Sequence, residues 1–174
     1  MQLIHGFHLT KDNVTYCTVA GPESVLKKCI EIGIGKEKLL KTELNESFDA
    51  GPFKIIPVKS FHCDNEATGL VIKSEGKIIY VSGDTEFRDE LHEIVLKAAG
   101  KNIDIAFVCI NGKWGNMSYK EAFDISKEIS AVTSIPMHYG LFAENTVNPA
   151  AFIDLCNKNG IISFEMDPGK SFEF

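Results

Sequence analysis

The chain has 174 residues, of which 44% are hydrophobic, 24% charged and 10% aromatic, and its formal net charge is -6. This length and composition predict one domain over residues 1–174 and exclude the disordered, collagen-like and coiled-coil classes. Arg88 is the only arginine, so we expect no nucleic-acid partner, because a binding face for nucleic acid usually gathers several guanidinium groups.

The first predicted elements are a strand and a helix. Residues 14–20 are rich in β-branched and aromatic side chains, which is typical of a strand. Pro22 then opens a helix that Gly33 ends. The next strand is predicted over residues 53–61, where Pro57 indicates a sheet edge or a bulge because proline has no amide hydrogen to donate.

A hairpin and a helix follow. Residues 68–73 and 77–82 are apolar runs of strand length, joined by a short turn over residues 74–76. Apolar side chains then recur at helical spacing over residues 88–99, and Gly100 marks the end of that helix.

Strands and helices alternate in the last part of the chain. Residues 103–110 form a nearly continuous apolar run, as expected of a strand covered on both faces. Ser118 and Glu121 fit a capping box at the start of a helix that runs to about residue 129. The series ends with a strand, a helix and a strand, over residues 132–137, 150–157 and 161–166. Hairpin-linked strands followed by β-α-β alternation predict an α/β protein of stacked sheet and helix layers.

The cysteines and the N-terminal sequence indicate the cellular location of the protein. Five cysteines are scattered singly without a C-x-x-C pair, which predicts reduced thiols in a cytoplasmic protein, most of them small core residues. The chain has neither a secretory leader pattern nor a run near the roughly 18 apolar residues of a membrane span. We therefore expect neither export nor membrane insertion.

Three side chains able to bind a metal stand where predicted strands end: His62, Asp84 and His138. Strand ends meet at a common crevice in layered α/β folds, so we expect these side chains to lie together. Taken singly, each is more often a hydrogen-bonded residue or a turn cap, and it is their shared placement that favours a metal site. Two imidazoles and a carboxylate suit zinc, or manganese if more oxygen ligands join.

The segments around these residues resemble the second half of a metallo-β-lactamase-fold hydrolase. The resemblance rests on His62, on Tyr80-Val81-Ser82-Gly83-Asp84-Thr85 and on Ile135-Pro136-Met137-His138-Tyr139-Gly140. Further segments are similar to the L-ascorbate-6-phosphate lactonase-like branch of that family, namely Gly21-Pro22 and residues 33–38, 110–112, 115–122 and 142–146.

The resemblance implies a four-layer αββα sandwich with a metal centre at one edge. In such enzymes two divalent ions, zinc or manganese, supply a hydroxide that attacks the carbonyl or phosphoryl centre of a small-molecule substrate. The resemblance makes Asp84 the bridging carboxylate, His62 a ligand of one metal and His138 a ligand of the other, with Asp84 and His138 as the catalytic residues. It also places three residues near the substrate: Asn111, Lys113 and Asn116.

The family pattern begins with H-x-H-x-D-H, which this chain lacks. The nearest match is His5, His8 and Asp12, whose spacing is wrong, so we expect an exposed helix or turn there. Without the motif each metal has two protein ligands, short of the three that catalytic zinc sites keep. We therefore expect an N-terminally incomplete fold with a bare sheet edge, from a late start site, a truncated or processed chain, or a remnant that has lost catalysis.

Two functions stay open. One is a lactonase-like, metal-dependent hydrolase, impaired in this chain, and the other is a non-catalytic fragment that associates with itself or a partner. A doubly wound cofactor-binding domain is a weaker reading, because Gly33, Gly35 and Lys36 lack the spacing of a phosphate-binding loop. Trp114 stacks on a ligand or anchors its own loop. Cys63 follows His62, but neighbouring strand residues point to opposite faces, so we expect no contact between them.

Overall fold

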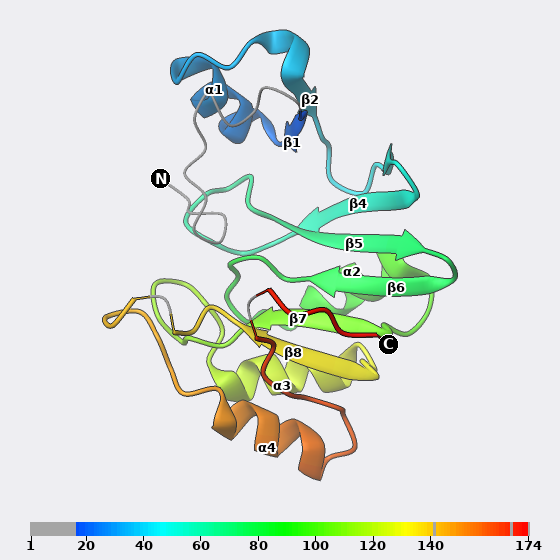
Figure 1. Cartoon of the computed structure of the whole chain (residues 1–174), viewed down its shortest axis with the longest axis vertical. Coiled ribbons are helices and arrows are strands. Elements are labelled where there is room, and N and C mark those ends of the chain that lie inside the picture. The colour runs from blue at the N-terminus through cyan, green and yellow to red at the C-terminus, as the bar shows by residue number, and fades with distance from the viewer. Residues whose placement is uncertain (1–16, 141, 168, 174) are drawn as a thin grey trace.

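The strands form two separate sheets in the computed structural model, which describes residues 17–140, 142–167 and 169–173 (Figure 1). The smaller sheet pairs β1 (Val19–Gly21) in parallel with β2 (Leu39–Lys41). The larger sheet has the order β3-β4-β5-β6-β7-β8. Its strands are β3 (Phe48–Ala50), β4 (Phe53–Lys59), β5 (Thr68–Ser74), β6 (Lys77–Val81), β7 (Ile105–Cys109) and β8 (Thr133–Met137).

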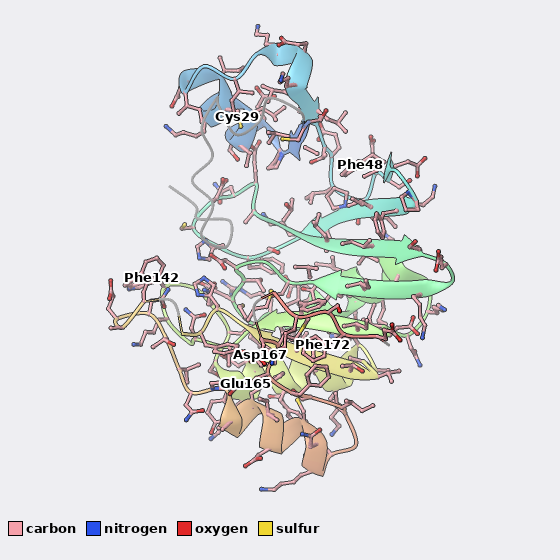
Figure 2. All side chains as sticks on the ribbon, viewed as in Figure 1. Cys29, Phe48, Phe142, Glu165, Asp167 and Phe172 are labelled. Carbon is pink, nitrogen blue, oxygen red and sulfur yellow. The ribbon has the colours of Figure 1, made fainter. Side chains whose placement is uncertain are left out.

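The smaller sheet belongs to a β1–α1–β2 unit, residues 19–41. Helix α1 (Glu23–Glu31) and the 3-10 turn η1 (Lys36–Lys38) connect its two strands. The predicted helix boundaries are confirmed, since α1 begins directly after Pro22 and Gly33 follows it with a φ of 88°. Cys29 and Ile34 are buried together in this unit, where Figure 2 marks Cys29.

The first predicted strand is observed only at its end. β1 starts at Val19, and residues 14–16 lie outside the described part of the chain, as do His5, His8 and Asp12.

The antiparallel half of the larger sheet follows the predicted hairpins. β5 and β6 pair through a two-residue turn in which Glu75 and Gly76 have φ values of 50° and 77°. Pro57 is paired with Leu70 of β5, and its carbonyl accepts a hydrogen bond from the Asn45 amide on the other side of β4. The side of β4 on which Pro57 lacks an N–H thus faces away from β5, past the end of the short β3. The hydrogen-bond ladder between β4 and β5 is therefore kept, as expected for a proline at a sheet edge.

The parallel half, β6 to β8, alternates with helices. α2 (Leu91–Ala99) connects β6 to β7, α3 (Tyr119–Glu128) connects β7 to β8, and α4 (Ala150–Lys158) follows β8. The predicted capping box is present at α3. α2 begins later than residue 88, because a turn closed by the Leu91 amide on the Arg88 carbonyl precedes it. A mixed sheet flanked by helices confirms the predicted α/β class.

The last predicted strand, over residues 161–166, is wrong. Only Ile162 pairs with the sheet, in an isolated parallel bridge to Thr133. The Asn157 side chain accepts from the Ser163 amide and donates to the Ser163 carbonyl. The Ser163 amide and carbonyl are therefore hydrogen-bonded to a side chain of α4 and cannot pair with a neighbouring strand. For this reason the apolar residues of this segment do not form a strand.

The two faces of the larger sheet are buried to different extents. Val71, Tyr80 and Ala106 are neighbours across β5, β6 and β7, and all are 0% exposed in the core shared with α2, α3 and α4. The alternate row, Leu70, Val81 and Phe107, is only half-buried.

Two further predictions concern cysteines and membranes. Cys29, Cys109 and Cys156 are buried, as predicted for most of the cysteines. Among the described residues, no helix combines the length and apolar character needed to cross a membrane.

Candidate metal centre

Asp84 and His138 meet at the carboxyl ends of β6 and β8. His138 Nε2 lies 3.1 Å from Asp84 Oδ1, and the two side chains are 29% and 27% exposed. Both strands run parallel to β7 between them, so their carboxyl ends share one edge of the sheet. The structure therefore brings together two of the three predicted metal ligands, in a contact partly shielded from water.

The backbone on both sides of this contact has an unusual conformation. Gly83 has a φ of 59°, and a Cβ at this position would lie 3.0 Å from the Thr68 carbonyl oxygen, so any other residue would be strained and crowded here. His138 has a φ of 66° although it carries a bulky side chain. Strain of this kind is tolerated where the surrounding structure fixes one geometry, and here it fixes the imidazole against Asp84.

The contact changes the protonation of the imidazole. The hydrogen bond from His138 to Asp84 raises the His138 pKa above its ordinary value, and this effect outweighs partial burial, which lowers it. The pair therefore favours an imidazolium beside a carboxylate. A metal ion binding at Nε2 has to displace that proton, so its affinity increases with pH.

His62 lies on the bend that follows β4, beside the loop that carries Asp84. The Phe61 amide donates to the Thr85 hydroxyl at 2.9 Å, and the Glu86 amide donates to the Phe61 carbonyl at 2.7 Å. A Cβ on Gly115 would lie 3.4 Å from His62 Cδ2 and 3.6 Å from Glu86 Oε1. His62 is thus a neighbour of Glu86 and Gly115, on a loop bonded to the one that follows Asp84.

The expectation that Cys63 avoids His62 is wrong. Cys63 Sγ lies 3.1 Å from His62 Nδ1. β4 ends at Lys59, and residues 62–64 form a bend, so the alternation of side chains along a strand does not apply to them.

The predicted substrate residues tie two loops together. The Asn111 side chain, 5% exposed, donates to Asn145 Oδ1 at 2.6 Å, and Lys113 Nζ donates to the Glu144 carbonyl at 2.9 Å. Asn116 Oδ1 is buried and has no hydrogen-bond partner among the described residues. The loop after β7 is therefore fixed to the loop after β8, while contact of Asn111, Lys113 and Asn116 with a substrate stays a prediction.

The described residues fit a divalent metal in donor type but not in donor number. A carboxylate and an imidazole are ligands that zinc and manganese accept. Across residues 17–140, 142–167 and 169–173, however, no cluster of three or more His, Cys, Asp or Glu side chains could hold an ion. Asp84 and His138 can therefore hold a catalytic metal only together with another ligand.

Two neighbours of the site were not predicted from the sequence: Glu86 and Asn145. Glu86 stands two residues after Asp84 in the same loop, and that nearness was an available signal. Asn145 reaches Asn111 across 34 residues, and no local spacing reports a contact of that kind.

Comparisons with known proteins agree with this architecture. A family model described as the beta-lactamase superfamily domain matches residues 7–139. A UPF0173 metal-dependent hydrolase of Enterococcus faecalis is 33% identical over 89 residues, which cover 51% of this chain and 38% of that protein. One from Sulfurisphaera tokodaii is 24% identical over 147 residues, 82% of this chain and 63% of that protein. The match thus spans less than two thirds of either relative.

Solved structures of metallo-β-lactamase-fold proteins have the same fold. A metallo hydrolase from the archaeon Ignicoccus hospitalis superposes with a TM-score of 0.76 at 22% identity, covering 93% of this chain and 71% of that one. A metallo-beta-lactamase fold protein from Bacillus subtilis gives 0.67 at 16% identity, covering 85% and 61%. At these identities the likeness shows the fold.

Proposed function

Because the chain belongs to the beta-lactamase superfamily, we propose that it acts as a metal-dependent hydrolase in which Asp84 and His138 bind a divalent ion. The observation that carries the proposal is the 3.1 Å contact between these side chains at the carboxyl ends of β6 and β8. An acidic and a basic side chain held together where parallel strands end, partly shielded and on strained backbone, support the assignment of a ligand pair.

In this reaction the chain's own residues bind the metal ion and hold one another in position. A bound zinc or manganese ion would supply a nucleophilic hydroxide near neutral pH and would polarise the bond under attack. Asp84 Oδ1 holds the imidazole of His138 in place, and the two side chains would bind the ion together. The Ser82 hydroxyl, which accepts from the Cys109 amide at 3.1 Å and donates to the Gly83 carbonyl at 2.7 Å, fixes the turn that presents the carboxylate.

The proposal requires ligands besides this pair. His62 is the first of them, because its loop is bonded to the residues that follow Asp84. The described part of the chain contains no preassembled group of three donors, so the proposal assigns His62 from the position of its loop and requires further ligands besides it. With His62, the pair supports the two-metal arrangement that the sequence resemblance implies.

The substrate is a small molecule with a carbonyl or phosphoryl centre, and a lactone is the preferred class within it. A chain with a net charge of -6 and a single arginine is poorly suited to bind nucleic acid. The cysteine usage favours a cytoplasmic protein.

Hydrolysis by the metal-loaded protein tests the proposal. The chain, treated with chelator and reloaded with zinc or manganese, is assayed on δ-valerolactone, phenyl acetate, methyl acetate and bis(4-nitrophenyl) phosphate. Chelation should abolish turnover, and reloading should restore it. Asp84→Asn and His138→Gln should lower kcat/KM by about 100-fold, because loss of a ligand costs at least as much as loss of its supporting contact.

Two matched variants are the controls. Asp89→Asn changes an exposed carboxylate and His92→Gln an imidazole on α2, and both should keep full activity. Turnover that survives chelation, turnover unchanged in Asp84→Asn, or no turnover of any of the four substrates by the metal-loaded protein would each contradict the proposal.

A second candidate function rests on the half-buried apolar row formed by Leu70, Val81 and Phe107. An apolar sheet face of this kind suits association with another copy of the chain or with a partner, without catalysis. Sedimentation velocity over a range of concentrations tests self-association. Two tightly bound ions together with hydrolase activity would exclude the non-catalytic reading.

A further inference from the structure

Trp114 is the only tryptophan in the chain, and its side chain is mostly in water. It is 67% exposed, more than any other large hydrophobic residue in the described part of the protein. Within that part, its indole has neither a stacked ring nor a cation–π partner. The indole therefore gains little from its own loop, which favours stacking on a ligand among the two roles open to it.

The residue sits at the tip of a short hairpin, residues 111–118. Asn111 and Ser118 form an antiparallel bridge, and the Gly112 amide donates to the Met117 carbonyl at 2.9 Å. Trp114 and Gly115 occupy the turn with φ values of 53° and 81°. Positive φ at both central residues is typical of a type I′ turn, which favours Asn and Gly. A bulky side chain is strained at the first position, and burial does not offset that strain here.

The hairpin is fixed at several points around the candidate metal centre. Met117 is fully buried, and its amide donates to the Thr85 carbonyl at 2.8 Å. Asn111 and Lys113 bind the loop after β8 through Asn145 and Glu144. Because these contacts brace the base of the hairpin, its tip has a defined position before any ligand binds.

That position is beside His62 and Glu86, on the loops next to the candidate metal centre. A Cβ on Gly115 would lie 3.4 Å from His62 Cδ2 and 3.6 Å from Glu86 Oε1. Trp114 directly precedes Gly115, so the exposed indole belongs to the same turn as the residue that approaches His62.

We propose that Trp114 is a specificity-determining residue that stacks against a flat ring of the substrate while the bond to be hydrolysed lies at the Asp84–His138 pair. This inference rests on the proposed function and adds a substrate class to it: esters or lactones that carry a ring. Aromatic and other flat rings gain most from an exposed indole face.

Charge near the tip favours a neutral or anionic ring. Lys113 directly precedes Trp114, so a cationic substrate would be repelled at the indole. Glu86, the carboxylate nearest the turn, is paired with Arg88 at 2.7 Å, which offsets its charge. Stacking of a cation on the indole is therefore less favoured than stacking of a ring.

The tryptophan emission of the protein reports on Trp114 alone, because it is the only tryptophan. Zinc-loaded protein is titrated with phenylphosphonate and with methylphosphonate, which share the anionic group and differ in the ring. Phenylphosphonate should shift the tryptophan emission and bind about tenfold tighter, the size of a stacking contact. Methylphosphonate should bind without a comparable emission change.

Two substitutions separate stacking from a structural role. Trp114→Gly removes the ring and suits the positive φ, so it should fold with an unchanged or higher Tm. Calorimetry should show that it has lost the preference for phenylphosphonate, and its kcat/KM ratio of phenyl acetate to methyl acetate should fall by about tenfold. Trp114→Phe should keep most of the preference.

The outcomes distinguish this inference from the proposed function. Equal affinity of the wild-type protein for both phosphonates, or an unchanged substrate ratio in Trp114→Gly, overturns the role of Trp114 and leaves metal-dependent hydrolysis standing. No binding of either phosphonate together with no hydrolysis of either ester overturns both. A Tm lowered by Trp114→Gly with unchanged ligand preference assigns the residue to its loop instead.

Discussion

The β1–α1–β2 unit and the six-stranded sheet differ in how they are stabilised. The unit buries Cys29 and Ile34 against a few partly buried neighbours, whereas the large sheet shares one extensive core with three helices, including the fully buried Leu91, Ile125 and Phe152. Because stabilisation follows buried apolar area at about 25 cal/mol per Å², most of the folding free energy belongs to the sheet. All the candidate site residues within the described chain are attached to that sheet or its loops.

The smaller unit still bears on the site. The Ser24 hydroxyl donates to Asp64 Oδ2 at 2.9 Å, and the Ser24 amide donates to Glu66 Oε2 at 2.5 Å. Asp64 and Glu66 belong to the loop that begins with His62. The comparison therefore indicates a division of roles: the large core fixes Asp84 and His138, and the small unit holds one side of the His62 loop.

The largest expected effect on stability comes from truncating a buried isoleucine, and it compares the cores of the two regions directly. Ile125→Ala should lower the free energy of unfolding by about 3 kcal/mol or more, because it leaves a cavity in a core that cannot collapse around it. Ile34→Ala removes the same atoms from the small unit and should lower the free energy of unfolding by about 2 kcal/mol, because fewer buried neighbours surround it. Urea unfolding of both variants provides the measurement. Equal losses would show that the two regions share one cooperative core.

Backbone strain at the site should have the next largest effect. Gly83→Ala should cost about 2 kcal/mol, because the new Cβ meets the Thr68 carbonyl in addition to the penalty of positive φ. Gly51→Ala is the matched control, since Gly51 has a φ of 60° and open space around it, and it should cost about 1 kcal/mol. Thermal unfolding compares them, and a Gly83 variant no worse than the Gly51 variant would contradict the close approach.

Loss of the helix cap should be smaller again. Ser118→Ala removes the side chain that accepts from the Glu121 amide and should cost about 1 kcal/mol. The loss should appear as a lower denaturant midpoint with an unchanged slope. An unchanged midpoint would mean that the hairpin before α3, and not the cap, determines where the helix begins.

The smallest effect is a pH dependence of the metal-free protein. The raised His138 pKa means that the pair with Asp84 stabilises the fold fully below the unfolded pKa of about 6.5. That contribution is lost as the pH rises through the higher folded pKa. Urea unfolding in chelator at pH 6 and pH 9 should therefore show a stability difference between wild type and His138→Gln that shrinks at high pH. A difference independent of pH would contradict the contact.

Sequence patterns predicted the elements whose signals are local. The capping box at Ser118 and the turn at Glu75 and Gly76 depend on neighbouring residues, and both are present. The strand over residues 161–166 failed because the Asn157 side chain occupies the backbone of Ser163, a tertiary contact that β propensity does not contain.

The same limit applies to the site. The contact between Asp84 and His138 could be predicted from the sequence, because both residues follow strands that end at the same edge of the sheet. The contacts of His62 with Cys63 and of Asn111 with Asn145 depend on how the chain bends after a strand and on how loops meet. No spacing in the sequence encodes either of them.

Binding of zinc by the Asp84–His138 pair tests the central claim most directly. Isothermal titration calorimetry at neutral pH on the metal-free chain should show zinc binding that Asp84→Asn and His138→Gln each weaken by at least about tenfold. Asp89→Asn and His92→Gln should bind zinc like the wild type. Equal zinc affinity in all five proteins, or no zinc binding by the wild-type chain, would contradict the assignment of this pair as metal ligands.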